Sequence, residues 1–201
     1  MAGPNPNAPA LQPPGAGLPW WERLAAKYVV FPRACRRLGW AGAAELFQAE
    51  GARVLAIWDS LPAGRLAERV LIRRFAGIED SSRYWSAEMT VEHLTVVGAG
   101  IRHIVRSLRR GDAIDRPARV EDVKPRGEAG PAAVRAVFVR LLADVAEEEK
   151  VEPPIPPGVG PRHAHPWFGP IDAFRWHALL GIHQGLHRRQ LDAIRAGLGA
   201  A

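Results

Sequence analysis

Two histidines near the C-terminal end of the chain, His183 and His187, lie four residues apart. On an α-helix this spacing places both imidazoles on one face, one turn above the other. Such a pair can bind one metal ion but cannot complete its coordination shell. The same pair is also compatible with two hydrogen-bonded core histidines, because a buried imidazole needs partners for its nitrogens.

A third histidine, His93, lies on the apolar stripe of a different predicted helix. If the two helices pack together, the three imidazoles form a face of three nitrogen ligands. Such a face suits Zn²⁺, Ni²⁺ or Fe²⁺ and leaves other positions open to water or a substrate. Position 184 is Gln, so the glutamate of an HExxH zinc protease is missing, and the sequence also lacks the Glu-x-x-His pairs of a di-iron bundle.

Three further residues are candidates for supporting roles around this site. Gln190 shares the helix face of His183 and His187 and could orient a ligand or a bound water. His177 is out of phase with that face, so we expect it to flank the site rather than to bind metal. We expect His165 either to pack at the start of the last helix or to take part in the site.

Four long segments with apolar residues at helical period must position these histidines. The segments are residues 43–60, 87–110, 131–149 and 170–196. Ser86 is a suitable N-cap for the second segment, and Gly111 suits the position just after its end. Pro131 and Pro170 suit the first positions of the third and fourth segments. A shorter helix is predicted at residues 20–28, and residues 151–169 form a long loop rich in Pro and Gly. The pattern predicts an all-α protein, a four-helix bundle with an extra short N-terminal helical segment and long loops.

The length of 201 residues suits one domain with a sizeable core. Residues 1–19 contain six prolines and few large apolar side chains, so we predict a flexible tail there and a single bundle domain over residues 20–201. The one cysteine, Cys35, cannot form an internal disulfide, and the sequence has neither a recognisable signal peptide nor a membrane-spanning run. We therefore expect a cytoplasmic protein with no membrane partner.

The net charge is +6, from 27 Lys and Arg against 21 Asp and Glu. A basic balance is compatible with nucleic-acid binding. However, the arginines are spread along the chain among acidic residues, and no basic run carries aromatic residues for stacking on bases. We therefore expect no nucleic-acid partner.

Three motifs together resemble the DinB/YfiT-like superfamily of metal-binding four-helix bundles. Residues 85–94 resemble its Trp-Ser…His-Leu entry to the second helix, and residues 183–191 resemble its final-helix signature, His-x-x-x-His-Arg-Gly-Gln. Residues 165–170 are similar to the His-Pro-x-Phe-Gly stretch that some members carry before that helix. The resemblance covers about residues 43–197. The chain departs from it at Arg189, where glycine is common, and in the additional segment at residues 20–40.

The resemblance implies that His93, His183 and His187 are the metal ligands. It also implies a metal-dependent S-transferase or isomerase that acts on a small molecule with a low-molecular-weight thiol. Because many members have no known reaction, a non-catalytic metal- or ligand-binding module associated with stress is an equally open alternative. A homodimer is compatible with the bundle and with the apolar area of seven tryptophans.

Overall fold

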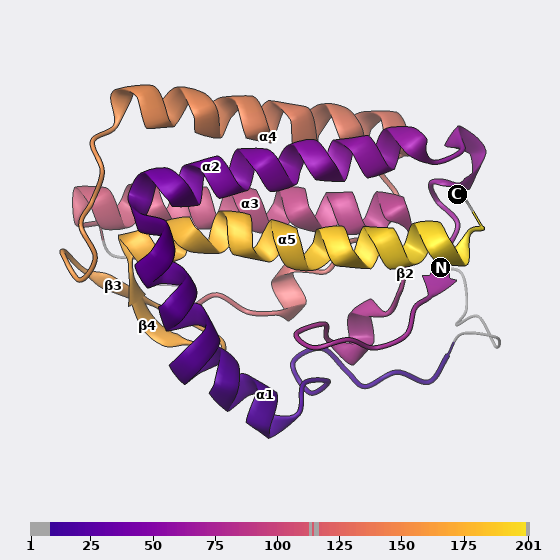
Figure 1. Cartoon of the computed structure of the whole chain (residues 1–201), viewed down its shortest axis with the longest axis horizontal. Helices are drawn as coiled ribbons and strands as arrows, with labels where there is room; N and C mark the ends of the chain where they lie inside the picture. Colours follow the sequence, from indigo (N-terminus) through magenta and orange to yellow (C-terminus); the bar gives the residue numbers. More distant parts are fainter. Residues whose placement is uncertain (1–8, 113, 115–116, 200–201) are drawn as a thin grey trace.

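The computed structural model describes residues 9–112, 114 and 117–199, and its main feature is a bundle of four long helices (Figure 1). These helices are α2 (Phe31–Ser60), α3 (Ala87–Arg110), α4 (Pro131–Val151) and α5 (Ala173–Gly197). The shorter elements are α1 (Trp20–Ala25), the π-helix η1 (Ala26–Val30), the 3₁₀ turns η2 (Ala63–Arg65), η3 (Asp80–Ser82) and η4 (Glu121–Val123), and the strands β1 (Val70–Leu71), β2 (Tyr84–Trp85), β3 (Arg162–His165) and β4 (Gly169–Asp172). The predicted mostly helical bundle is confirmed, with two small hairpins that the sequence pattern did not indicate. None of the described helices is long and apolar enough to cross a membrane.

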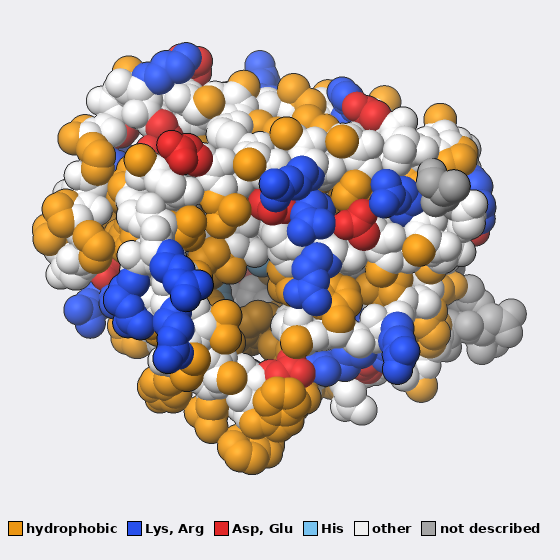
Figure 2. Space-filling view, viewed as in Figure 1, with side chains coloured by type: hydrophobic (Ala, Val, Ile, Leu, Met, Phe, Trp, Pro, Cys, Tyr) orange, Lys and Arg blue, Asp and Glu red, His pale blue; other side chains and the backbone are white. Residues whose placement is uncertain are grey.

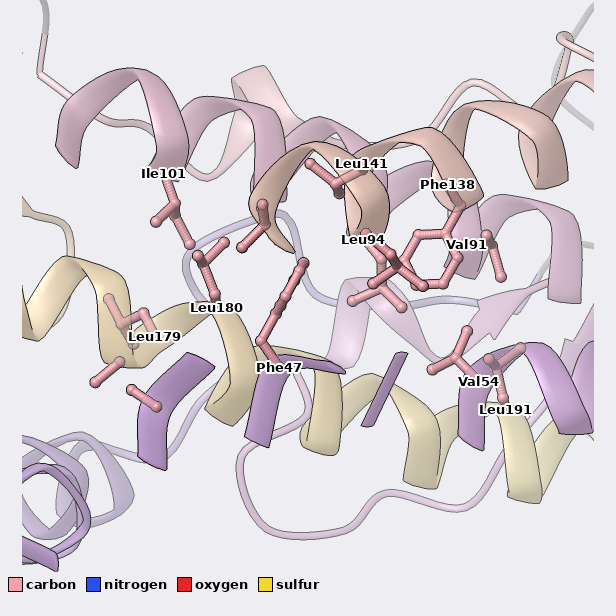
Figure 3. Close-up of a cluster of buried hydrophobic side chains, with 14 of the residues drawn as sticks. Phe47, Val54, Val91, Leu94, Ile101, Phe138, Leu141, Leu179, Leu180 and Leu191 are labelled. Carbon is pink, nitrogen blue, oxygen red and sulfur yellow. The ribbon is translucent and has the colours of Figure 1, made fainter. Parts of the chain in front are cut away.

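All four long helices contribute to one apolar core (Figure 3). Phe47 of α2, Leu94 of α3, Phe138 of α4 and Leu191 of α5 are almost completely buried there. Close approach of α2 and α5 depends on Gly181, because a Cβ at this position would lie 2.8 Å from the backbone nitrogen of Phe47. This contact holds α5 against α2 two residues before His183.

Helices α3 and α4 run in the same direction, although they are consecutive in the bundle. Glu88 at the start of α3 accepts a hydrogen bond of 2.8 Å from the backbone N–H of Gly130, where α4 begins. At the other end, Arg102 of α3 forms an ion pair with Glu148 of α4. The connection between the two helices therefore returns along the length of the bundle, and it brings η4 beside the first turns of α3, next to His93 (Figure 1).

Helix α3 begins and ends where the capping residues indicate. The Ser86 hydroxyl accepts a hydrogen bond of 3.1 Å from the backbone N–H of Met89, as an N-cap does. Gly111 follows the last turn with a φ of 75°, which glycine adopts at no steric cost. These two ends place His93 about two turns into the helix.

Helix α5 begins later than predicted, because Pro170 lies in a strand rather than at the first helical position. The antiparallel hairpin of β3 and β4 pairs His165 with Gly169. Asp172 then caps α5 by accepting a hydrogen bond of 2.8 Å from the backbone N–H of Arg175. The stretch 151–169, predicted as a loop, thus contains one strand of a hairpin that leads directly into the helix of the histidine pair.

The N-terminal helical segment is longer than predicted and continues into α2. The helix over residues 20–38 meets the rest of α2 at a kink, where Gly39 has a φ of 61°. Before it, residues 9–19 lie against the loop at residues 77–82: the backbone N–H groups of Gln12 and Gly15 donate to the carboxylates of Asp80 and Glu79. Residues 1–8 of the predicted tail lie outside the described part of the chain.

Candidate metal centre

Three imidazoles meet between α3 and α5. His93 comes from α3, and His183 and His187 come from successive turns of α5. One ring nitrogen from each lies within 4.8 Å of the corresponding nitrogens of the other two, so the three histidines could hold a metal ion. His93 and His187 are buried and His183 is partly exposed.

A backbone carbonyl decides which nitrogen of His93 is available. Its Nδ1 lies 2.7 Å from the carbonyl oxygen of Val123 in η4. A carbonyl oxygen can only accept, so Nδ1–H is the donor and the neutral ring keeps its lone pair on Nε2. The crossover connection therefore turns the Nε2 lone pair of His93 toward α5.

Gln190 has the same effect on His187. The Nδ1 of His187 lies 2.6 Å from the side-chain oxygen of Gln190, and the Gln190 nitrogen donates a hydrogen bond of 2.7 Å to the carbonyl oxygen of Ser82. The second bond identifies the amide oxygen as the acceptor for His187. This chain of hydrogen bonds leaves the lone pair of His187 on Nε2 and fixes the orientation of the ring, as the outer partners of metal-binding histidines do.

The third imidazole faces the first. His93 Nε2 and His183 Nε2 lie 3.2 Å apart. Because His93 Nε2 carries a lone pair, a proton on His183 Nε2 satisfies both nitrogens in the metal-free protein. Transfer of that proton to His183 Nδ1, with the ring still neutral, frees both Nε2 atoms as ligands. The donor set therefore fits a divalent metal of the kind that accepts imidazole.

Burial keeps the three rings neutral, which metal binding requires. Desolvation lowers the pKa of His93 and His183 well below the ordinary value, and the neighbouring imidazoles lower both further. Desolvation also lowers the pKa of His187 to about 4, despite the opposing hydrogen bond to Gln190. All three are consequently unprotonated at neutral pH.

A cavity of about 160 Å³ opens beside the three imidazoles. A cavity of similar volume in another protein accommodates benzene, so this one is large enough for part of a small molecule. Its apolar wall consists of Val97, Ile101, Ile104, Trp176, Leu179 and Leu186. The cavity is therefore suited to a ligand with an apolar body whose reactive end lies at the histidines.

Lys124 is the cation closest in sequence to η4, and it also lines the cavity. Its Nζ lies 5.2 Å from the centre of the Trp85 ring and donates to Glu79 and Ser81, at 3.1 Å and 2.7 Å. Desolvation lowers the pKa of Lys124, while Glu79 opposes this shift. Sequence reasoning missed Lys124, because nothing in a polar connection indicates which of its residues face the helices.

His165 lies on the cavity wall, separate from the group of three. Its Nδ1 accepts backbone hydrogen bonds from Trp167 at 3.1 Å and Phe168 at 3.4 Å, so the neutral ring carries its proton on Nε2. Desolvation lowers the pKa of His165 to about 3. His165 thus offers the cavity an N–H donor.

His177 lies in a different cluster, away from the three imidazoles. Its ring stacks on Trp40, with ring centres 4.1 Å apart, and its Nε2 lies 3.3 Å from the carbonyl oxygen of Trp40.

The structure therefore brings Gln190 directly to a candidate ligand, places His165 on the cavity wall and sets His177 apart. The carbonyls of Val123 and Ser82 were not among the candidates, because a backbone oxygen has no signature in the sequence.

In comparisons with known proteins, the chain matches no protein-family model, no curated protein and no solved structure. What is shown is a bundle of four helices with a cluster of three histidines.

Proposed function

We propose that the protein binds one divalent metal ion through His93, His183 and His187. The observation that carries this proposal is the use of the ring nitrogens. Two imidazoles donate Nδ1–H to outer acceptors and present Nε2 lone pairs to a common point, where they meet the third. A hydrogen bond between His93 and His183 accounts for two of the rings without metal. It does not account for His187, whose ring centre lies 4.6 Å from that of His93 and 4.4 Å from that of His183.

We further propose that the centre serves a metal- and thiol-dependent S-transferase or isomerase that acts on a small molecule. A divalent metal held by three imidazoles supplies Lewis acidity that lowers the pKa of a bound thiol or water. Three protein ligands leave positions open, unlike the four of a structural zinc site. The resemblance of three sequence motifs to the DinB/YfiT-like superfamily supports the same reaction class.

The other cavity residues have roles that agree with this reaction class. The apolar wall excludes water from the body of a bound substrate and so strengthens polar interactions at the histidines. His165 offers an Nε2–H that can donate to an oxygen of the substrate, and it stays neutral because of its burial. Lys124 uses its three N–H donors on Glu79, Ser81 and Ser82, and so fixes this part of the cavity wall beside the histidines.

The reaction class can be tested with the cobalt-substituted protein and a panel of low-molecular-weight thiols. We expect a thiolate-to-cobalt charge-transfer band on addition of the right thiol, followed by turnover with an electrophile of suitable size. The His183→Ala variant is the control and should show neither. If metal is bound but no thiol changes the spectrum and no electrophile is consumed above the control, the protein is the non-catalytic binding module instead.

A further inference from the structure

An apolar surface lies on the N-terminal arm, which we define as residues 20–38: α1, η1 and the part of α2 before the Gly39 kink. The arm projects from the lower edge of the bundle (Figure 1). Among the described residues, half of the exposed large hydrophobic side chains fall within the first eleven residues of this arm. They are Trp20, Trp21, Leu24, Tyr28, Val29 and Val30. Contiguous exposed apolar surface of this kind marks an interaction site.

The arm is held in place, so its outer surface is a fixed feature of the fold. Glu22 is buried and accepts hydrogen bonds from Arg74 at 2.7 Å and from the backbone N–H of Gly77 at 3.1 Å. Further along, Phe31 stacks on Phe168 with ring centres 4.3 Å apart. These two anchors use the inner face of the arm and leave Trp20 and Tyr28 about two-thirds exposed, at 69% and 65%.

Positive charge accompanies the aromatic residues on this surface. Arg23, Arg33, Arg36 and Arg37 are exposed and Lys27 is partly exposed. Glu22 is the only acidic residue between positions 20 and 38, and it is already paired with Arg74. Figure 2 shows hydrophobic side chains over the tip of the arm and a patch of Lys and Arg side chains beside it.

This combination identifies the chemistry of the partner. Trp and Tyr prefer the boundary between lipid headgroups and acyl chains, and Arg and Lys are attracted by anionic headgroups. A second copy of the same arm would oppose positive charge with positive charge, which disfavours symmetric pairing. A nucleic acid would satisfy the charges but would leave aliphatic side chains such as Leu24, Val29 and Val30 without apolar contact.

We propose that the N-terminal arm docks the protein peripherally on an anionic phospholipid surface, with Trp20, Trp21 and Tyr28 inserted at headgroup level. We expected no membrane partner because the sequence has no membrane-spanning run. Peripheral docking through the arm needs no such run, so the proposal differs from that expectation. It does not depend on the metal centre, so metal-free and metal-loaded protein should bind alike.

The test is sedimentation of the full chain with vesicles of phosphatidylcholine, alone or mixed with phosphatidylglycerol. We expect binding to the mixed vesicles that weakens as salt is added, and little binding to the neutral ones. Each basic residue near an anionic surface contributes roughly fivefold in affinity, so Arg33→Gln/Arg36→Gln/Arg37→Gln should weaken binding on the order of 100-fold. The matched control, Arg110→Gln/Arg126→Gln/Arg140→Gln, removes the same charge from exposed positions outside the arm and should bind nearly as the parent does.

A second variant tests the aromatic contribution. Trp20→Ala/Trp21→Ala should lose binding to mixed vesicles and should also lose the blue shift of tryptophan emission that vesicles produce in the parent protein. Both residues are exposed, so its thermal midpoint should stay close to that of the parent. Equal binding to neutral vesicles, or an equal loss in the control triple variant, would overturn the proposal. Two other outcomes would also overturn the proposal. One is that the parent protein forms a dimer in the absence of vesicles and the tryptophan variant does not. The other is that the parent protein binds a DNA duplex but not the vesicles.

Discussion

Helix α5 carries buried histidines in two places, and the two places use their imidazoles differently. His177 donates its Nε2–H to the backbone carbonyl of Trp40 and stacks on the Trp40 ring. The indole N–H of Trp40 donates to Glu149 at 2.7 Å. The remaining nitrogen of His177 lies 3.7 Å from Glu149, too far for a hydrogen bond. At the metal centre, by contrast, His187 uses Nδ1–H for Gln190 and presents Nε2 to two other imidazoles.

Burial alone therefore does not distinguish a candidate ligand from a packed histidine. Desolvation lowers the pKa of His177 and of His187 to about 4 in both cases. The two histidines differ in what their second ring nitrogen faces. In His187 it faces two other imidazoles, whereas in His177 it faces only the carboxylate of Glu149. We therefore expect substitutions in the two clusters to change different quantities. Those at the metal centre should change metal affinity, and those around His177 should change only the free energy of unfolding.

The largest effect is expected from removal of a candidate ligand. Alanine at position 93, 183 or 187 should reduce bound Zn²⁺ from about one equivalent to background, because loss of one of three protein ligands weakens binding enough for dialysis to remove the ion. His177→Gln should keep the full equivalent. Elemental analysis after loading and dialysis measures both. If His177→Gln loses the metal while its circular dichroism stays native, the distinction between the clusters is wrong.

The second-largest effect is expected from His177, on the free energy of unfolding in acid. Its pKa falls from the ordinary 6.5 to about 4 on folding, mainly through desolvation. Above pH 6.5 the ring is neutral in both states; as pH falls below 6.5, only the unfolded chain takes up the proton. The free energy of unfolding should therefore fall by about 3 kcal/mol by pH 4 on account of this residue.

The measurement is urea unfolding of the parent and of His177→Gln across this pH range. The variant should start less stable at neutral pH and lose about 3 kcal/mol less on acidification. Parallel stability curves for the two proteins would mean that His177 is already protonated or solvated in the folded state.

Gln190 should have an intermediate effect, confined to the metal centre. Gln190→Leu removes the acceptor for His187 Nδ1–H and leaves the carbonyl oxygen of Ser82 without its donor. Loss of such an outer partner typically costs about 10- to 100-fold in metal affinity. Competition with a chelator measures this loss. Glu149→Gln in the other cluster is the matched control, and a similar loss there would contradict the assignment.

The smallest effect is expected at Trp40. Trp40→Phe keeps an aromatic ring against His177 but removes the N–H donor to Glu149. A hydrogen bond to a charged group contributes roughly 1.5–3 kcal/mol, and partial hydration of Glu149 should place the loss near the lower end. Chemical denaturation should show this loss with no change in metal affinity; an altered metal affinity would show that the two clusters communicate along α5.

Much of the fold could be predicted from local patterns. The apolar period predicts four long helices, and Ser86 and Gly111 mark the ends of α3 because capping is a local interaction. The start of α5 was predicted at Pro170 and is wrong, since a proline at a first helical position and a proline in a short edge strand look alike in sequence. The parallel course of α3 and α4 could not be predicted, because it depends on where a long polar connection lies.

For the candidate site, the sequence by itself determined the spacing of His183 and His187 on one helix face and the presence of His93 on another apolar stripe. Only the tertiary structure decided that the three rings meet, that His177 stacks on Trp40 elsewhere, and that the crossover connection delivers the carbonyl of Val123 to His93. The physical reason is that periodicity fixes which face of a helix a residue occupies. Which nitrogen of a ring remains available depends on hydrogen-bond partners that lie far away in the sequence.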